Sequence, residues 1–510
     1  MASLDSLTSW HSDWKQLKVA VIGLGVTGFS VADTLAELGC EVLVVAEKAD
    51  PEYIDILDVL GVSHVSGPEA SGVPARLTEF KPELVVTSPG VKPDSAIIRW
   101  AQDNRVAVWV DVDLAWRLRD KTAKVAKWVT ITGTNGKTTT TQLAAAMLEA
   151  AGNRVAACGN IGVPILDCIR DPEGFDFLVV ELSSFQLHYI DAIYPEASAL
   201  LNIDLDHIDW HGSFEVYAAT KGKIYQNTVT AAVYNRRDAR TQDLLENADV
   251  VEGCRAIGFN VGVPGPSDIG YSEDILCDRA FLDNRYHEAL EVATFEDIAE
   301  IGVVTPHLLA NVAAATALAR ACGATPADIR AAIRSFRLDK HRIELVAIHN
   351  GVSWIDDSKA TNPHATSASL ESFEHVVWIV GGLLKGVDIA PLVQAHAARL
   401  RGAVVIGAER QVVLDALAAH AIDVPVIEIS GEDNTQVMTQ AVLAASNLAA
   451  EGDTVLLAPS SASMDQFKDY ADRGNQFAAA VHALIGEKYW PPRPHQERLP
   501  RRRTKLRDRR

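Results

Sequence analysis

The chain has 510 residues, of which 48% are hydrophobic and 22% are charged, and its net charge is −20. This length exceeds what one hydrophobic core supports, so it predicts about three domains of an ordinary soluble globular protein. Residues 491–510 hold nine basic and two acidic side chains, which leaves the rest of the chain near −27 and argues against general nucleic-acid binding. We expect the tail to be a disordered solubilising extension, although its charge would also suit phospholipid, RNA or an acidic partner.

The sequence shows neither a membrane span nor a secretion signal. No apolar run approaches the ~18 residues that cross a bilayer, and the opening MASLDSLTSWHSDWK has no apolar signal-peptide core. A cytoplasmic protein is therefore expected. The cysteines lack a CxxC pair, which favours buried reduced thiols over disulfides or zinc. They are Cys40, Cys158, Cys168, Cys254, Cys277 and Cys322.

The first segment opens with a buried strand at residues 17–22, followed by GLGVTG at 23–28 and a helix to about Leu38. A second strand, Glu41 to Ala46, ends at Glu47, where a dinucleotide-binding fold keeps an acid for the ribose. A lone GxGxxG suits NAD, and it equally suits another pyrophosphate such as that of a UDP-sugar, so both remain open. A strand at 84–88 ends in Pro-Gly and places its loop beside the first at the carboxyl edge of a parallel sheet.

The central segment contains the strongest motif of the chain, KWVTITGTNGKTTTT at residues 127–141. An apolar β-branched run stops at Gly133, and a helical pattern runs from Lys137 to about Ala151. Glycines let backbone N–H groups close around phosphate oxygens, Lys137 can reach the β- and γ-phosphates, and Thr138 can hold Mg²⁺. The sequence therefore predicts a nucleotide triphosphate site, although Ile131 stands where the general pattern GxxxxGK[ST] has a glycine.

Two further strands of this segment carry polar residues at their carboxyl ends. The apolar strand 177–181 ends in Glu181, where a phosphate-loop fold places a metal-binding acid. The next strand, Ala199 to Ile203, leads into DLDHID, in which His207 stands among acids at the same sheet edge. Glu181 is the favoured protein carboxylate for Mg²⁺, and His207 is a candidate metal or substrate ligand.

A lysine on the helix that follows is expected to point inward. Ser213 can cap this helix, and Lys221 shares one face with Phe214, Tyr217 and Ile224 at helical spacing. A buried lysine is costly unless it is paired or chemically altered, whereas a snorkelling lysine would keep its charge in water. On composition alone, the snorkelling lysine is the favoured interpretation.

The remaining chain alternates between helices and strands. Residues 260–300 are expected to form loops and short strands, Pro306 begins an Ala-rich helix that carries Asn311, and a second helix, Pro326 to Phe336, closes the central domain. Asn350-Gly351 predicts a type I′ hairpin turn, and later strands are expected at 376–380, 404–406, 424–429 and 455–457. The sequence thus predicts an α/β protein with three domains: a Rossmann-like domain at 1–121, a phosphate-loop mononucleotide-binding domain at 122–337, a Rossmann-like doubly wound domain at 338–489, and the tail at 490–510.

From about Val19 to Glu487 the chain resembles the Mur ligase family. GTNGKTT at 133–139 is similar to the variant phosphate loop of that family, which accounts for the missing first glycine. Further similarity lies in Gly159-Asn160, ELSSFQ at 181–186, Asp206-His207 and His341-Arg342. DSKATN at 357–362 and SASMDQFK at 461–468 look like the D-glutamate-adding type within the family.

The resemblance implies a reaction and its site residues. The alanyl carboxylate of UDP-N-acetylmuramoyl-L-alanine would attack the γ-phosphate of ATP, and the amine of D-glutamate would displace phosphate from the acyl phosphate to form an amide. Two Mg²⁺ ions would offset the repulsion between the carboxylate and the triphosphate, and CO₂ would convert Lys221 into a carbamate that can bind one of them. The protein is expected to be a monomer that binds these small molecules.

The roles implied by the resemblance fall into four groups. Nucleotide binding is expected of Gly133, Thr134, Asn135, Gly136, Lys137, Thr138, Thr139, Asn311, Arg342 and Asp357. Metal binding is expected of Thr138, Glu181, His207 and carbamylated Lys221, while Lys137, Lys221, His207 and Lys359 are expected to be catalytic, with Lys359 near the transferred phosphate. The UDP-sugar path would be lined by Val26, Thr27, Ser88, Gly90, Asn160 and His207. D-glutamate would bind Thr361, Lys385, Ser463, Met464 and Tyr470, because a cation and hydroxyls suit two carboxylates.

Two positions depart from the family pattern, and other functions stay open. Ala46-Glu47-Lys48 replaces an acid followed by Thr-Arg, and Leu308 replaces a common asparagine. Within the class, a folate or other amino-acid ligase is the nearest alternative. From other classes, the first segment could belong to an NAD-binding dehydrogenase, or the chain could be an NTP-driven regulatory protein.

Overall fold

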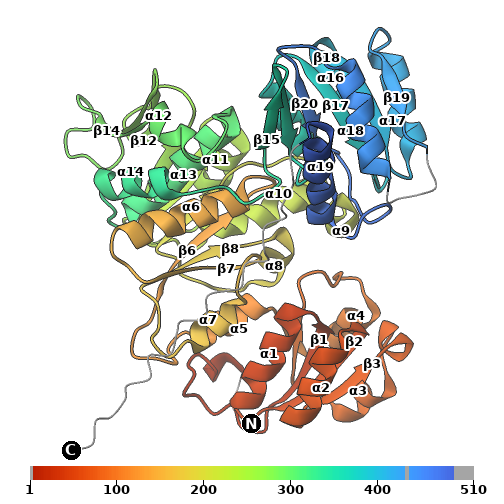
Figure 1. Ribbon diagram of the computed structural model, residues 1–510. Helices are drawn as coiled ribbons and strands as arrows, with labels where there is room; N and C mark the ends of the chain where they lie inside the picture. The colour runs from red at the N-terminus through yellow and green to blue at the C-terminus, as the bar shows by residue number, and fades with distance from the viewer. Residues whose placement is uncertain (1–3, 431–435, 487–510) are drawn as a thin grey trace, which may run out of the picture. The chain divides into compact units, whose positions relative to one another are not determined.

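The protein is described here by a computed structural model that covers residues 4–430 and 436–486 (Figure 1). The tail expected at 490–510 lies outside these residues. The chain divides into two compact units, Met1–Arg337 and Leu338–Arg510. Within the described residues, none of the helices combines the length and the apolarity that crossing a bilayer requires.

The first unit begins with a five-stranded parallel sheet of strand order β3-β2-β1-β4-β5. Alternate residues of its strands pack on opposite faces, with Val21 and Val44 against α1 and α2, and Ile22 and Val45 against α3 and α4. This two-sided burial is why the strands read as continuous apolar runs. The strands are β1 (Lys18–Leu24), β2 (Glu41–Ala49), β3 (Ser63–Ser66), β4 (Leu84–Thr87) and β5 (Ala107–Trp109), and the helices are η1 (Leu4–Ser6), α1 (Val26–Glu37), α2 (Pro51–Leu60), η2 (Pro68–Ser71), α3 (Ala75–Phe80), α4 (Ala96–Asp103) and α5 (Asp111–Leu118).

The same unit contains a nine-stranded sheet of order β14-β13-β12-β11-β10-β9-β6-β8-β7, parallel except for the pairs β12–β13 and β13–β14. Its strands are β6 (Lys127–Thr132), β7 (Val155–Gly159), β8 (Phe177–Glu181), β9 (Ala197–Leu200), β10 (Ala231–Asn235), β11 (Arg255–Phe259), β12 (Asp268–Ser272), β13 (Ile275–Asp278) and β14 (Leu290–Thr294). Its helices are α6 (Lys137–Ala150), α7 (Ile165–Arg170), α8 (Ser184–Tyr189), α9 (Ile208–His211), α10 (Phe214–Gly222), η3 (Lys223–Tyr225), α11 (Ala239–Glu246), α12 (Phe295–Ala299), α13 (Pro306–Ala321) and α14 (Pro326–Ser335).

One apolar core joins these two sheets through α5 and α7. Leu114 and Leu118 of α5 belong to the same buried cluster as Trp128 and Leu178 of the larger sheet. On the surface of this junction the Arg170 guanidinium pairs with Asp33 at 2.5 Å and with Glu37 at 2.8 Å. The first sheet is therefore packed against the second rather than attached by a linker alone.

The second unit is built on a six-stranded sheet of order β15-β16-β20-β17-β18-β19, parallel except for the β15–β16 hairpin. Trp354 and Ile379 pack on α18 and α19, whereas Ile355 and Trp378 pack on α15, α16 and α17. The strands are β15 (Glu344–His349), β16 (Val352–Asp356), β17 (Val376–Gly381), β18 (Leu400–Ile406), β19 (Val426–Glu428) and β20 (Thr454–Leu457), and the helices are α15 (Pro363–Glu371), α16 (Ala390–His396), η4 (Ala397–Arg399), α17 (Arg410–His420), α18 (Val437–Leu448) and α19 (Tyr470–Leu484).

Three expectations about local structure are corrected. β2 continues to Ala49 because Leu24 pairs with Ala49 beyond a register shift, so Glu47 lies inside the strand. β9 ends at Leu200 instead of Ile203, since the Ile203 amide donates to the Asp238 carboxylate at 2.9 Å instead of to a strand. The segment at 260–300 contains the helix α12 in addition to short strands.

Candidate active site

The phosphate loop, Gly133–Gly136, joins β6 to α6. Gly136 has φ of 81°, and a Cβ there would lie 2.4 Å from the Asn311 side-chain oxygen, so a larger residue would be strained and would also clash. The N-terminus of α6 has no side-chain cap. The first backbone N–H groups of α6 can therefore donate hydrogen bonds to an anion such as a phosphate, and the helix dipole adds to its binding.

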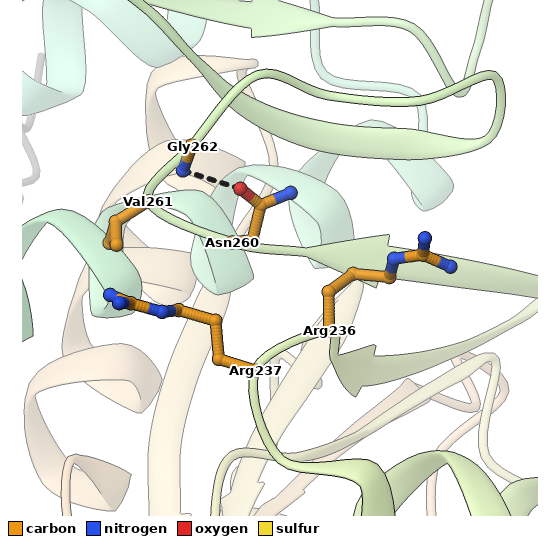
Figure 2. Close-up of a pocket in the computed structure, with 5 residues that line it drawn as sticks. All are labelled: Arg236, Arg237, Asn260, Val261 and Gly262. Atoms are coloured by element: carbon orange, nitrogen blue, oxygen red, sulfur yellow. Dashed lines mark hydrogen bonds between the residues drawn. The ribbon is translucent and has the colours of Figure 1, made fainter.

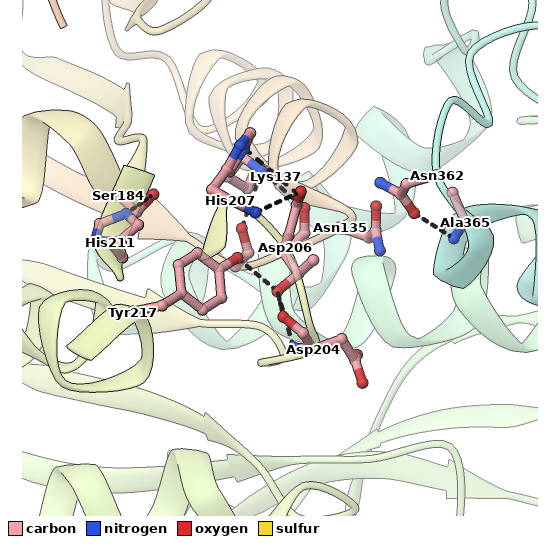
Figure 3. A network of polar contacts seen from close by, with 12 residues as sticks. Asn135, Lys137, Ser184, Asp204, Asp206, His207, His211, Tyr217, Asn362 and Ala365 are labelled. Atoms are coloured by element: carbon pink, nitrogen blue, oxygen red, sulfur yellow. Dashed lines mark hydrogen bonds and ion pairs between the residues drawn. The ribbon is translucent and has the colours of Figure 1, made fainter. Parts of the chain in front are cut away.

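The segment after β9 braces the phosphate loop from the side. The Asn202 side-chain oxygen accepts from the Asn135 amide at 2.9 Å, and its side-chain nitrogen donates to the Asn135 carbonyl at 3.1 Å. The Thr134 hydroxyl lies 2.9 Å from the Tyr217 hydroxyl and accepts from the Asp204 amide at 2.9 Å. Figure 3 shows Tyr217 of α10 pointing at this loop. The loop shape is thus set by residues about 70 positions later, such as Asn202 and Asp204.

Lys137 bends back over the loop that precedes it. Its ammonium donates to the carbonyl oxygens of Gly133 and Thr134, both at 2.9 Å. Thr138 is half-buried and Thr139 is buried in the first turn of α6. Asn311 of α13 lies beside the same turn, because its side-chain oxygen accepts from the Thr140 hydroxyl at 3.3 Å. The structure therefore brings together the residues expected to bind nucleotide in the first unit.

Glu181 lies at the carboxyl end of β8, next to β6, and its side chain is buried. One carboxylate oxygen accepts from the Asn160 side-chain nitrogen at 2.9 Å. Among the described residues, the other oxygen has no hydrogen-bond partner although it is buried. Burying a carboxylate oxygen without a hydrogen-bond partner costs free energy, so this oxygen is suited to bind a cation.

Lys221 of α10 is 2% exposed and points inward, as the helical spacing predicted. Its amine donates to the Gly133 carbonyl at 2.8 Å and to the Thr132 hydroxyl at 3.3 Å, and it lies 5.0 Å from the centre of the Tyr217 ring. Burial holds the pKa of Lys221 well below its ordinary value, and the positive charge of Lys137 lowers it further. The side chain is therefore buried rather than snorkelling, which corrects the interpretation favoured by composition.

His207 caps α9 in a left-handed conformation, with φ of 52°. Its ring lies 3.5 Å from the Asp206 carboxylate (Figure 3). The centre of the ring lies 4.7 Å from that of Phe185 of α8, with the two ring planes tilted at 58°. Burial lowers the pKa of His207, and the Asp206 carboxylate opposes that shift. A neutral imidazole is the form that binds a metal ion, so the surroundings suit the expected ligand role.

These residues suit Mg²⁺. Of the expected ligands, the Thr138 hydroxyl and the partnerless oxygen of Glu181 are the hard oxygen donors that Mg²⁺ prefers, whereas His207 offers a ring nitrogen. The partnerless buried oxygen of Glu181 is the observation that supports the match.

Four of the six residues expected on the UDP-sugar path lie at the carboxyl ends of β1 and β4, whereas Asn160 and His207 lie beside the larger sheet. Strand order reverses between these two strands, and ligands of open α/β sheets bind at that crevice. Val26 and Thr27 open α1, while Ser88 and Gly90 follow β4. A Cβ on Gly23 would lie 2.5 Å from the Ser88 hydroxyl, so the two loops touch. Asn160 is not at this crevice, since it binds Glu181 beside β8.

In the second unit, three neighbouring strands end in the remaining expected residues. Asp357 and Lys359 follow β16, Lys385 follows β17, and Ser463 follows β20, all at one edge because β16, β20 and β17 are parallel. Lys359 places its ammonium 3.8 Å from the centre of the Tyr470 ring. The other expected residues of this unit are Arg342 before β15, Thr361 before the Asn362 cap of α15, the exposed Met464 after Ser463, and Tyr470 at the start of α19.

Asp357 is buried among hydrogen-bond donors. The Ser369 hydroxyl donates to one carboxylate oxygen, and the Ile343 amide donates to the other at 3.3 Å. Burial raises the pKa of Asp357 to about 6, against the lowering effect of Ser369 and of the Arg342 charge. Asp357 is therefore fixed in place by its own contacts.

Sequence reasoning missed several residues that shape these sites. Asn202 follows β9 at the sheet edge, and that position was the available signal. The Gln186 side-chain oxygen accepts from the amide of Ser183, the N-cap of α8, and its side-chain nitrogen donates to Asp111 at 3.3 Å. Arg473 is fully buried and contacts two loops of the second unit, yet no local pattern marks it.

A hollow of about 380 Å³ lies at the carboxyl ends of β10 and β11 (Figure 2). It is lined by Arg236, Arg237, Asn260, Val261 and Gly262. Arg236 lies 3.6 Å from the Asp268 carboxylate, and the Asn260 side chain accepts from the Gly262 amide of its own loop. Arg236 and Asn260 thus have partners within the protein, and the hollow gives no sign of a particular ligand.

A parallel sheet with a phosphate loop, together with a carboxylate, a histidine and a buried lysine at the same edge, defines a nucleotide triphosphate-dependent enzyme. Each of the other two α/β sheets also has polar residues at the carboxyl ends of its strands. Three family descriptions match in chain order: "Mur ligase MurD-like, N-terminal domain" at 17–110, "Mur ligase middle domain" at 131–319, and "Mur ligase, glutamate ligase domain" at 341–461. The chain belongs to the Mur ligase family, which confirms the resemblance and displaces the dehydrogenase alternative.

Similar proteins cover nearly the whole chain. The UDP-N-acetylmuramoylalanine--D-glutamate ligase of Leifsonia xyli subsp. xyli is 57% identical over 494 residues, which are 95% of this chain and 96% of that protein. The ligase of the same name from Streptomyces coelicolor is 48% identical over 93% of this chain and 99% of that protein. The crystal structure of UDP-N-acetylmuramate-alanine ligase from Thermotoga maritima shares the fold, with a TM-score of 0.53 at 18% identity over 92% of this chain and 99% of that chain.

Proposed function

We propose that the protein is an ATP-dependent ligase that joins D-glutamate to UDP-N-acetylmuramoyl-L-alanine in the synthesis of peptidoglycan precursors. The observation that carries the proposal is the 57% identity over 95% of the chain to a ligase of that name. The placement of the phosphate loop, Glu181, His207 and Lys221 at one sheet edge supports an ATP-dependent reaction.

The reaction is proposed to run in two displacements. An alanyl carboxylate oxygen attacks the γ-phosphorus of ATP and ADP leaves, which gives an acyl phosphate. The amine of D-glutamate then attacks the acyl carbon, loses a proton, and expels inorganic phosphate as the C–N bond forms. Both attacks bring anions together, so the protein must lower that electrostatic cost.

The phosphate loop supplies part of this compensation. The N–H groups at the start of α6 would bind the phosphates of ATP. Lys137 would exchange its two loop carbonyls for the β- and γ-phosphate oxygens, because a charged acceptor makes a stronger hydrogen bond than a carbonyl. Asn311, Arg342 and Asp357 would contact the rest of the nucleotide, and Lys359 would sit near the transferred phosphate.

Lys221 is proposed to be carbamylated. A neutral amine attacks CO₂, releases one proton and becomes an N-carboxylate. The burial and the neighbouring Lys137 charge that lower the pKa of Lys221 also favour the reactive neutral amine. The carbamate would join Thr138, Glu181 and His207 in holding two Mg²⁺ ions, which when bound polarise the phosphate and shield negative charge.

The other expected residues are proposed to bind the two remaining substrates. Val26, Thr27, Ser88 and Gly90 would line the UDP-sugar path at the β1/β4 crevice, where two loops in contact leave backbone N–H groups near a pyrophosphate. Asn160 and His207 would bind the far end of that substrate. Thr361, Lys385, Ser463, Met464 and Tyr470 would bind D-glutamate. The cytoplasmic location and the monomeric state stay predictions.

The test is ADP release by the purified chain with UDP-N-acetylmuramoyl-L-alanine across a panel of D-glutamate, L-glutamate, L-lysine and diaminopimelate. We expect release that requires both the UDP-sugar peptide and D-glutamate. Release with L-lysine or diaminopimelate in place of D-glutamate would assign the chain to another ligase type. Slow hydrolysis indifferent to every amino acid would instead indicate an NTP-driven regulatory protein.

A further inference from the structure

Arg473 lies in the first turn of α19 and is 0% exposed. A fully buried guanidinium requires hydrogen-bond acceptors around it, since isolated burial of a charge is costly. Burial lowers the pKa of Arg473 to about 10, and the carboxylates of Asp465 and Asp356 oppose that shift. The side chain therefore keeps its charge at neutral pH inside the second unit.

The guanidinium joins two loops that are about 100 residues apart in the chain. Its Nε donates to the Ser358 hydroxyl and one terminal nitrogen donates to the Ser358 carbonyl, both at 2.9 Å. Both terminal nitrogens also donate to the Ser461 carbonyl at 3.2 Å. The Ser358 hydroxyl in turn donates to the Tyr470 carbonyl at 2.7 Å, which closes the link onto the start of α19.

Each of these contacts is next to a residue proposed to bind substrate. Ser358 precedes Lys359, Ser461 lies two positions before Ser463, and Tyr470 is one turn before Arg473 on the same helix. The Lys359 ammonium over the Tyr470 ring shows that the loop of Lys359 also meets the start of α19. Asp357, by contrast, is held by Ser369 and the Ile343 amide, independently of Arg473.

We propose that Arg473 is a positioning residue for the amino-acid substrate, which holds the loop of Lys359 and Thr361 against the loop of Ser463. This inference rests on the proposed function, because it assigns D-glutamate to these two loops. Two parallel N–H donors on one rigid plane can bridge two backbone carbonyls, whereas a lysine ammonium cannot reproduce that planar fork. Loss of the fork separates the two halves of the D-glutamate site and leaves the separately anchored Asp357 in place.

The test compares Arg473→Lys with the wild-type chain in steady-state ADP release, with each substrate varied in turn. We expect the KM for D-glutamate to rise about tenfold or more, which corresponds to the loss of one charged hydrogen bond. The KM values for ATP and for the UDP-sugar peptide should stay within about twofold. Equal changes in all three KM values, or a lower melting temperature with an unchanged KM for D-glutamate, would overturn the inference.

A milder variant covers the case in which Arg473→Lys does not fold. Ser358→Ala removes one of the four Arg473 contacts and the bond to Tyr470, while the backbone carbonyls stay, so the KM for D-glutamate should rise about threefold. An unchanged KM in this variant would also count against the inference. Arg399→Lys is the matched control, since Arg399 of the same unit donates to the single Phe373 carbonyl at 2.9 Å before β18.

The outcomes separate the two proposals. Wild-type ADP release that does not depend on D-glutamate would overturn the proposed function, and the role of Arg473 would fail with it. Wild-type release that does depend on D-glutamate, combined with an unchanged KM in both variants, would overturn only the role of Arg473.

Discussion

The Lys221 amine donates a 2.8 Å hydrogen bond to the Gly133 carbonyl, so α10 is tied to the first residue of the phosphate loop. The contact occurs where Lys137 also donates to Gly133, which brings two amines to one carbonyl oxygen. Two ammonium groups this close repel each other, and burial strengthens the repulsion. This repulsion adds to burial in lowering the pKa of the buried member, Lys221.

The first prediction concerns the carbamate. We expect Lys221→Arg and Lys221→Ala to lower the rate of ADP release at least ~100-fold, because neither side chain can form an N-carboxylate and a metal ligand is lost. The wild type should lose activity in CO₂-depleted buffer and regain it with bicarbonate. A ¹³C NMR carbamate signal after addition of ¹³C-bicarbonate, present in the wild type and absent in Lys221→Arg, is the direct measurement. Full wild-type activity in CO₂-free buffer would contradict the assignment.

The second prediction uses the partnerless oxygen of Glu181. Glu181→Gln keeps an oxygen that can accept from Asn160 and removes the buried charge, so the melting temperature without Mg²⁺ should stay the same or rise slightly. The rate should fall about 100-fold, and the Mg²⁺ concentration for half-maximal rate should increase. Melting curves and Mg²⁺ titrations measure the two effects separately. A destabilised variant with an unchanged Mg²⁺ requirement would show that Glu181 is only structural.

The third prediction concerns pH and the buried start of α5. Burial raises the pKa of Asp111 to about 6, although the Gln186 side chain donates to it. A carboxyl group with a raised pKa in the folded state binds its proton more tightly there than in the unfolded chain. Its contribution to stability is therefore present at low pH and is lost as the pH rises from about 4 to above 6.

The variant Asp111→Asn tests this sign. It should raise stability by only about 0.5 kcal/mol at pH 4 and by about 3 kcal/mol at pH 8, a few °C in melting temperature, since the amide oxygen still accepts from Gln186. Asp103→Asn, at an exposed position at the end of α4, is the control. A gain of stability that is equal at both pH values would mean that Asp111 does not titrate in this range.

The local parts of the fold and site could be predicted because short-range patterns specify them. The apolar run with Glu181 at its end is β8 as expected, and Ser213 caps α10 through the Val216 amide. Asn350 and Gly351 have φ of 51° and 74°, as a type I′ turn requires. α12 was missed although Thr294 and Asp297 form a capping box, which is a signal that the sequence contains.

The missed contacts join distant parts of the chain. From the sequence, Asn202 is only a residue that follows a strand. In the fold, its side chain forms hydrogen bonds with both the amide and the carbonyl of Asn135. The residues around Arg473 in α19 do not indicate that its side chain contacts two loops, each more than ten residues away in the chain. Asp111 begins a short helix, and its burial depends on the junction with Gln186. Such contacts depend on tertiary packing, which periodicity does not encode.

The last prediction separates backbone strain from a clash in the phosphate loop. Gly136 and Gly152 both have positive φ, 81° and 87°, on either side of α6. A Cβ on Gly136 would lie 2.4 Å from the Asn311 side-chain oxygen, whereas one on Gly152 would meet nothing within 4 Å. Gly152→Ala should therefore cost only the left-handed strain, about 1 kcal/mol, and leave the KM for ATP unchanged. Gly136→Ala should cause the same strain and also displace Asn311, so the KM for ATP should rise at least ~10-fold. The double variant Gly136→Ala/Asn311→Ala should recover part of the stability lost through the clash, but it should not recover ATP binding. If both single variants raised the KM equally, strain at the ends of α6 rather than contact with Asn311 would explain the glycine.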